Sequence, residues 1–355
     1  MAPKGGVKRL DWPDDSRQSK CIDVPPLSRD GIGEALESMG YPVASLASRV
    51  DILGTLKRLT EGDPLLVRMY AESLWKNAEA SQRIEPEELE KLDPGYGSFF
   101  KDWFAKQSGN WSDPNSPLRK QLEAVLAVLS VALGPIEHRH LETTCGIVSG
   151  HHTFSLSMKD IEPIQRFLIG DGNDNGYSFQ HPKFAQYFKD DYFKNGHMVS
   201  VAEESIKAWG KNIVSEMNSG RIEPKNVPTY VLNYYVFHLL KAADDPQAME
   251  SILLDGWQCA WFEHDGGYAR YASDIAALMD AFRKSKLDGG SQFAMRVRCG
   301  LILSSIRSIG INTPSELLVA LVQHGKMSSR QAPGPAPPCD GAPASVQTAI
   351  RARRP

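Results

Sequence analysis

Residues 168–184 read LIGDGNDNGYSFQHPKF, and this stretch decides the fold of the central part of the chain. Two short segments that look like strands, 168–169 and 177–181, flank the hexapeptide DGNDNG, which is dense in residues that accept positive φ. Such segments joined by such a turn predict a β-hairpin. Pro182 then fits the first position of a helix. The stretch therefore predicts a hairpin that leads directly into a helix.

Helical periodicity precedes this hairpin. Apolar residues recur at alternating spacings of four and three over 118–132, which predicts a helix that Gly134-Pro135 ends. Further helices are expected from about Glu137 and over 158–167. Three helices followed by a hairpin have the outline of a winged helix, which we expect over 116–197.

A tight corner is expected within LTEGDPLL at residues 59–66. The helix before it shows one apolar face and is expected to open at Ser48. Gly62 fits the C-terminal stop of that helix. Asp63 fits the N-cap of the next helix, with Pro64 at its first position. The sequence thus predicts a helix–Gly–Asp–Pro–helix corner.

The C-terminal half reads as successive helices of unequal length from about 198 to 327. They show no fixed repeat period, so we expect an α-solenoid or an irregular bundle. After Lys326 the composition changes to QAPGPAPP at 331–338 and to the basic end RARRP at 351–355. Such segments cannot pack a core, so we expect a disordered tail over 329–355.

The composition allows a sizeable core. The chain has 355 residues and is 41% hydrophobic. Its formal net charge of -3 indicates neither a nucleic-acid partner nor an anionic membrane. Its five cysteines are far apart, with no CxxC pair, so a reducing, cytoplasmic location is expected. The longest apolar run, 124–133, is about half the ~20 residues of a membrane span. No apolar stretch follows Met1, so we expect no signal peptide.

No complete catalytic centre is visible in the sequence. It has no GxxxxGK[ST] phosphate loop, no apolar run that ends in paired acids for Mg²⁺, no HExxH and no GxSxG. The pair His151-His152 lacks a neighbouring cysteine or acidic cluster, and it fits a solvated loop better than a metal site. We therefore expect neither catalytic residues nor a bound metal.

Two features allow a binding role beside a structural one. His181 lies where a predicted strand meets a helix, so it could donate to a phosphate oxygen or serve as a core or capping histidine. At the corner, free amides at the helix start favour anions, and the Pro64 ring could pack on a flat base. An ordinary helix–helix turn is the alternative there. The local sequence favours the structural interpretation at both places.

Several segments together resemble the STAND-class signalling ATPases, which include NACHT proteins and the apoptotic ATPases. LTEGDPLL at 59–66 resembles the GxP motif of their helical lid, and GSFFKDW at 97–103 resembles the segment after the lid in bacterial members. LAVLSVALGP at 126–135, RFLIGD at 166–171 and YSFQHPKF at 177–184 resemble their winged-helix domain. The helices from about 198 resemble their arm. The resemblance covers roughly residues 20–330 and depends on the order and spacing of these segments.

The resemblance implies a nucleotide role for the residues Gly62, Pro64 and His181. The proline of the GxP motif packs near the adenine in that family, and the winged-helix histidine contacts the ADP phosphate in the closed state. The cofactor of intact relatives is ATP or ADP. A strand expected over 20–24 then looks like the last strand of a nucleotide-binding sheet.

The expected fold is mainly α, divided into a remnant of an α/β nucleotide-binding sheet (1–27), a helical lid (28–115), a winged-helix domain with one β-hairpin (116–197), α-solenoid-like helices (198–328) and the tail (329–355). The family's phosphate loop and magnesium-binding acids should precede residue 20, and this sequence does not contain them. The chain thus resembles a fragment, a degraded copy or the product of a reading-frame change near residue 331. We expect no ATP hydrolysis and weak or no nucleotide binding.

Two other functions remain open. One is a helical scaffold that binds another protein and has no nucleotide role. The other is a DNA-binding winged helix, against which the acidic hairpin counts. We expect protein partners or self-association and no membrane partner, and nucleic acid is not an expected partner.

Overall fold

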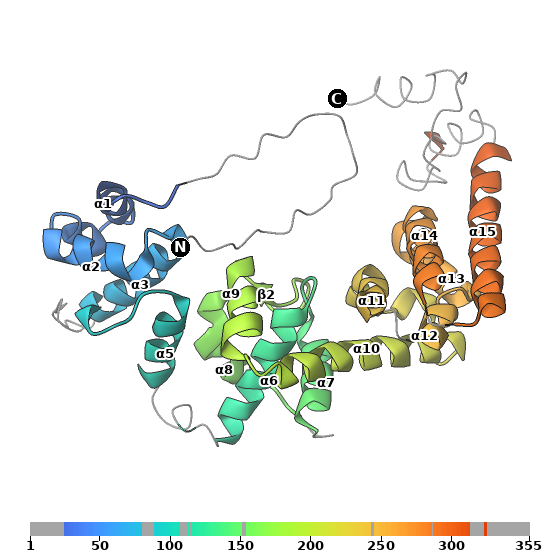
Figure 1. Cartoon of the computed structure of the whole chain (residues 1–355), viewed down its shortest axis with the longest axis horizontal. Helices are drawn as coiled ribbons and strands as arrows, with labels where there is room; N and C mark the ends of the chain where they lie inside the picture. Colours follow the sequence, from blue (N-terminus) through green and yellow to red (C-terminus); the bar gives the residue numbers. More distant parts are fainter. Residues whose placement is uncertain are drawn as a thin grey trace. The chain divides into compact units, whose positions relative to one another are not determined.

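The chain is mainly helical in a computed structural model, which describes residues 25–79, 89–106, 113, 116–150, 154–242, 245–285, 287–312 and 323–324 (Figure 1). The mainly α fold is thereby confirmed. The chain divides into two compact units, of which the first ends at Lys106. No helix among the described residues is long and apolar enough to cross a bilayer. The expected strand over 20–24, the His151-His152 pair and the tail over 329–355 lie outside the described residues.

The first unit packs its helices around residues such as Ile32 and Leu56, which are fully buried. Its described elements are α1 (Arg29–Ser38), the 3-10 turn η1 (Val43–Leu46), α2 (Val50–Thr60), α3 (Pro64–Glu79) and α5 (Tyr96–Lys106). The expectation that Ser48 opens a helix is wrong, because α2 begins two residues later. The Ser48 hydroxyl instead donates to the carbonyl oxygen of Ser45 at 3.3 Å, within the turn that follows η1.

The second unit begins with helices around a short hairpin, and we name residues 116–192 the hairpin block. Its elements are α6 (Pro117–Val131), α7 (His138–Ser149), α8 (Met158–Ile161), the 3-10 helix η3 (Glu162–Phe167), β1 (Leu168–Ile169), β2 (Ser178–Phe179), α9 (Pro182–Tyr187) and the π-helical turn η4 (Phe188–Tyr192). The predicted hairpin is confirmed, since β1 and β2 pair antiparallel with Leu168 opposite Phe179. Tyr177 also forms an isolated bridge with Ile136, just before α7, so a third extended segment joins the hairpin.

Two elements of the hairpin block are shorter than the sequence pattern suggests. The helix expected over 158–167 changes to 3-10 geometry after Ile161, because Pro163 has no N–H to continue the α-helical bonds. The strand expected over 177–181 ends at Phe179, and His181 has left the sheet to begin α9. The rings of Phe167 and Phe184 meet edge to face at 5.5 Å in the core beneath the hairpin.

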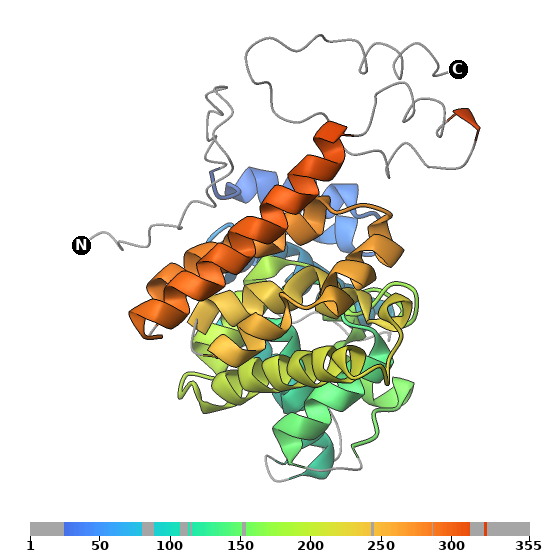
Figure 2. The same cartoon turned by 90° about the vertical axis from the view of Figure 1, so that its right-hand side faces the viewer.

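The remainder of the second unit is a series of helices, residues 197–312, which we name the arm. Its elements are α10 (His197–Asn218), the 3-10 turn η5 (Pro224–Asn226), α11 (Thr229–Ala242), α12 (Pro246–Ser251), α13 (Asp255–Asp265), α14 (Ala269–Lys284) and α15 (Gly289–Asn312). Helix α10 packs on α6 and α7 of the hairpin block and on α11 of the arm. Helix α15 lies along α14 at the end of the series (Figures 1 and 2). The hairpin block and the arm thus form one continuous packed body.

Candidate functional site

Gly62 lies inside the corner between α2 and α3. It is buried with φ at +84°, and a Cβ built there would lie 2.4 Å from the carbonyl oxygen of Leu27. The Leu27 amide donates to the Gly62 carbonyl at 2.8 Å, and Lys57 Nζ donates to the Leu27 carbonyl at 2.7 Å. Only glycine fits where these two backbones meet. Gly62 therefore shapes the corner and is covered by the segment before α1.

The first amides of α3 are used within the corner. Oδ1 of Asp63 accepts hydrogen bonds from the amides of Leu65 at 2.9 Å and Leu66 at 3.3 Å, so the predicted N-cap is confirmed. The Asp63 carbonyl accepts the amide of Val67 at 3.0 Å. Asp63 thus occupies the amides of this helix start, as expected for the ordinary helix–helix turn, and they are not free to bind an anion.

Pro64 is exposed at the first position of α3, where its ring is open to a ligand. Beside it, the Tyr96 hydroxyl donates to Oδ1 of Asp63 at 3.0 Å. Burial and the Asp63 carboxylate raise the pKa of Tyr96, so this hydroxyl keeps its proton. The corner therefore offers the ring of Pro64, rather than main-chain amides, to a binding partner.

His181 is the N-cap of α9. Its Nδ1 accepts the amide of Lys183 at 3.2 Å, which confirms the capping alternative. Because Nδ1 accepts, the neutral ring carries its proton on Nε2. The side chain is half-buried, with its ring 6.4 Å from that of Phe184. Contact of His181 with a phosphate stays a prediction.

The three residues predicted to bind nucleotide fall in different units. Gly62 and Pro64 belong to the first unit and His181 belongs to the second. None of the three lines the pockets described below.

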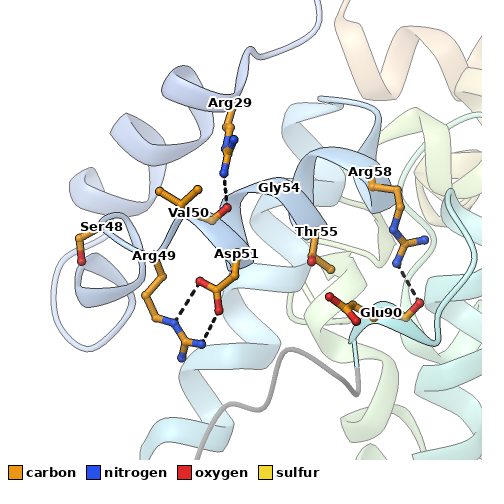
Figure 3. A pocket seen from close by; sticks show the side chains of 9 residues that line it. All are labelled: Arg29, Ser48, Arg49, Val50, Asp51, Gly54, Thr55, Arg58 and Glu90. Carbon is orange, nitrogen blue, oxygen red and sulfur yellow. Dashed lines mark hydrogen bonds and ion pairs between the residues drawn. The ribbon is translucent and has the colours of Figure 1, made fainter.

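An open groove of about 1050 Å³ runs along one side of α2, and the sequence pattern did not indicate it. Figure 3 shows its lining, which is Arg29, Ser48, Arg49, Val50, Asp51, Gly54, Thr55, Arg58 and Glu90. Four of these residues, at positions 51, 54, 55 and 58, share one helical face of α2. In the sequence, the polar face of α2 was the signal that could have indicated this groove. The groove also needs residues that are distant in sequence, so this signal did not suffice.

The guanidinium groups in this groove bind other parts of the first unit (Figure 3). Arg29 donates to the carbonyl of Val50, and Arg58 donates to the carbonyl of Glu90 at 3.1 Å. Nη2 of Arg49 lies 2.6 Å from Oδ2 of Asp51, and this hydrogen bond lowers the pKa of the carboxyl. Arg29 and Arg58 therefore hold neighbouring backbone segments in place, and Arg49 pairs with the carboxylate of Asp51.

Within the described ranges, no group of three or more His, Cys, Asp or Glu side chains is placed to hold a metal ion. Cys145 is fully buried, and burial raises the pKa of its thiol, so it does not resemble an activated nucleophile. No protein-family model, no curated protein and no solved structure matches this chain.

Proposed function

We propose that the chain is the regulatory part of a STAND-type signalling NTPase, in which Pro64 and His181 are nucleotide-binding residues. The observation that supports this most is the state of His181. Its Nδ1 is held by the amide of Lys183, so Nε2 is the hydrogen-bond donor of the neutral ring. A donor at the start of a helix, on a half-exposed ring, suits a phosphate oxygen.

The corner supports the same proposal from the other unit. Gly62 and Asp63 fix the turn through the main chain, and this leaves the ring of Pro64 exposed at the start of α3. The apolar ring of proline can pack on a flat nucleobase without any hydrogen bond. In this account Gly62 and Asp63 position Pro64, and Pro64 makes the contact.

The order of elements in the hairpin block agrees with a winged helix. Helices α6, α7 and α8 with η3 precede the hairpin, and Ile136 between the first two helices pairs with Tyr177. The tip of the hairpin carries the exposed acids Asp171 and Asp174, which disfavour binding to a phosphate backbone. We therefore assign the block to nucleotide sensing and not to DNA reading.

The proposed activity is binding without hydrolysis. Bound ADP would hold the chain in an inactive state, and release of ADP would activate it. With no phosphate loop in the sequence, affinity should be weak and the hydrolysis rate should not exceed that in buffer.

Calorimetric titration of the full chain with ADP tests this function. We expect weak binding that His181→Ala lowers by about tenfold, since a charge-assisted hydrogen bond to phosphate is lost. His197→Ala, an exposed histidine at the start of α10, is the matched control and should bind as the parent chain does. An absence of ADP binding, or equal binding by the two variants, would overturn the proposal.

A helical scaffold is the second candidate, and a stripe on α15 favours it. Phe293, Val297 and Leu301 recur every fourth residue and are 68%, 42% and 64% exposed. An apolar helical stripe of this kind is a common docking face for another protein. If ADP does not bind, the scaffold becomes the better account of the chain.

A further inference from the structure

A pocket of about 680 Å³ lies between the hairpin, the turn before α7 and the first turns of α11. We name it the junction pocket, because it is where the hairpin block meets the arm. The residues that matter here are Glu137, Ile169, Asp171, Asp174, Tyr230 and Tyr234. Its volume is in the range of ~300–1,000 Å³ that ligand sites occupy, and pockets between structural parts are frequent binding sites.

The junction pocket is anionic. It is lined by three carboxylates and by no lysine or arginine. Oδ1 of Asp171 accepts the amides of Asn173 at 2.9 Å and Asn175 at 3.1 Å. These bonds lower the pKa of Asp171, so its carboxylate is charged at neutral pH. Glu137 is paired with Arg139 outside the lining, so the excess negative charge comes from Asp171 and Asp174.

Apolar and aromatic surface adjoins these acids. Ile169 is 54% exposed on the hairpin, and on α11 the half-buried ring of Tyr234 lies 5.0 Å from the buried ring of Tyr230. A Cβ at Gly170 would lie 2.2 Å from the carbonyl oxygen of Gly176, so close packing of the hairpin keeps this wall free of side chains. The pocket therefore combines a π-face, an aliphatic wall and carboxylates.

That combination selects a side chain with an apolar stem and a cationic head. Arginine fits best, because its planar guanidinium both stacks on tyrosine and binds a carboxylate through two N–H groups. An anionic ligand such as a nucleotide finds no cation in this lining. A metal ion finds no suitable group of ligands within the described ranges.

We propose that the junction pocket binds an arginine side chain from a peptide segment of a partner protein. Bound there, the segment would contact both the hairpin and α11. Its affinity would therefore depend on how the hairpin block packs against the arm. The junction pocket is a different site from the proposed nucleotide-binding residues, so the failure of either proposal leaves the other unaffected.

Fluorescence anisotropy with the full chain tests the inference. The probe is a fluorescein-labelled heptapeptide of sequence GARARAG, and GAQAQAG is its uncharged match. The test variant is Asp171→Asn with Asp174→Asn, in which the side-chain oxygen at position 171 can still accept the hydrogen bonds of the turn. The control is Asp190→Asn with Asp191→Asn, which removes the same charge from exposed positions on η4 outside the pocket.

We expect the arginine peptide to bind, the glutamine peptide not to bind, and the test variant to lose about tenfold in affinity. The control variant should lose less than about twofold. Equal losses in both variants would mean that only net charge is sensed, and they would overturn the site, as would an arginine peptide that does not bind.

Two further outcomes would identify another occupant. The first is that peptide binding becomes stronger when Arg351, Arg353 and Arg354 are replaced with glutamine. That result would show that the chain's own tail occupies the pocket. A dimer in sedimentation that the test variant disrupts would make it a second copy. Either result would overturn the assignment to a partner protein.

Discussion

The hydroxyl of Tyr230 accepts a hydrogen bond from the amide of Leu133 at 3.1 Å, which ties the first turn of α11 to the turn after α6. The same hydroxyl lies 3.0 Å from Nε2 of His238. Burial lowers the pKa of His238 to about 4, so its ring is neutral and can accept the hydroxyl proton. One buried side chain thus joins the hairpin block to the arm.

Tyr230→Phe should destabilise the second unit. It leaves the Leu133 amide and Nε2 of His238 without this partner, at a cost of about 1–3 kcal/mol. Urea unfolding followed by tryptophan fluorescence measures the loss. Tyr234→Phe, whose hydroxyl is not part of this network, is the matched control. Equal stability of the two variants would contradict the role assigned to Tyr230.

Asp274 should make the arm less stable as pH rises. It is 8% exposed, and its Oδ2 accepts the indole N–H groups of Trp257 at 3.0 Å and Trp261 at 2.8 Å. Burial raises its pKa to about 6 from the ordinary value of 3.8. The folded chain therefore binds more protons than the unfolded chain between these pH values, and stability falls across that window.

The test compares the parent chain with Asp274→Asn by urea unfolding at pH 4 and at pH 7.5. Relative to the variant, the parent should lose roughly 2 kcal/mol of unfolding free energy between the two pH values. Titrating histidines act on both proteins and cancel in the difference. Asp280→Asn, exposed on the same helix, should show no such difference. A relative stability that is constant with pH would refute the raised pKa.

Gly62→Ala should destabilise the first unit far more than Gly40→Ala. Both glycines have positive φ, at +84° and +80°, so both substitutions carry a similar backbone cost of about 1–2 kcal/mol. Only at Gly62 does the new Cβ meet the backbone of Leu27, whereas nothing lies within 4 Å at Gly40. Thermal unfolding should rank Gly62→Ala clearly lower, and equal midpoints would show that the corner is not tightly packed.

Local chemistry explains which parts of this fold could be predicted. Asp63 as N-cap and Pro64 as the first residue of α3 follow from residues that are neighbours in sequence, and the structure has both. The hairpin followed in the same way from the turn residues of 171–176. These features depend on backbone conformations that only a few residue types favour.

Most of what the sequence did not predict depends on contacts between distant segments. Ser48 is the exception, because its hydroxyl donates to the nearby carbonyl of Ser45 in the turn after η1. The α2 groove needs Arg58 to meet a segment about thirty residues away, at Glu90. The junction pocket needs the hairpin to meet α11. The pattern of residues within one helix or strand does not indicate which distant segments that element will contact.

Pro64 and His181 are each proposed to contact bound ADP, and a spin-labelled nucleotide tests this for each residue separately. A nitroxide label is placed on α3 with Arg68→Cys in one protein and on α9 with Gln186→Cys in another, both at exposed positions. The exposed Cys259 is replaced by serine, as are the cysteines at positions 21 and 339.

Double electron–electron resonance then measures the distance between each label and a nitroxide-labelled ADP. A narrow, short-distance peak is expected for both labels, and His181→Ala should weaken the peak of the α9 label. The absence of a short-distance peak in either protein would contradict the proposed contacts.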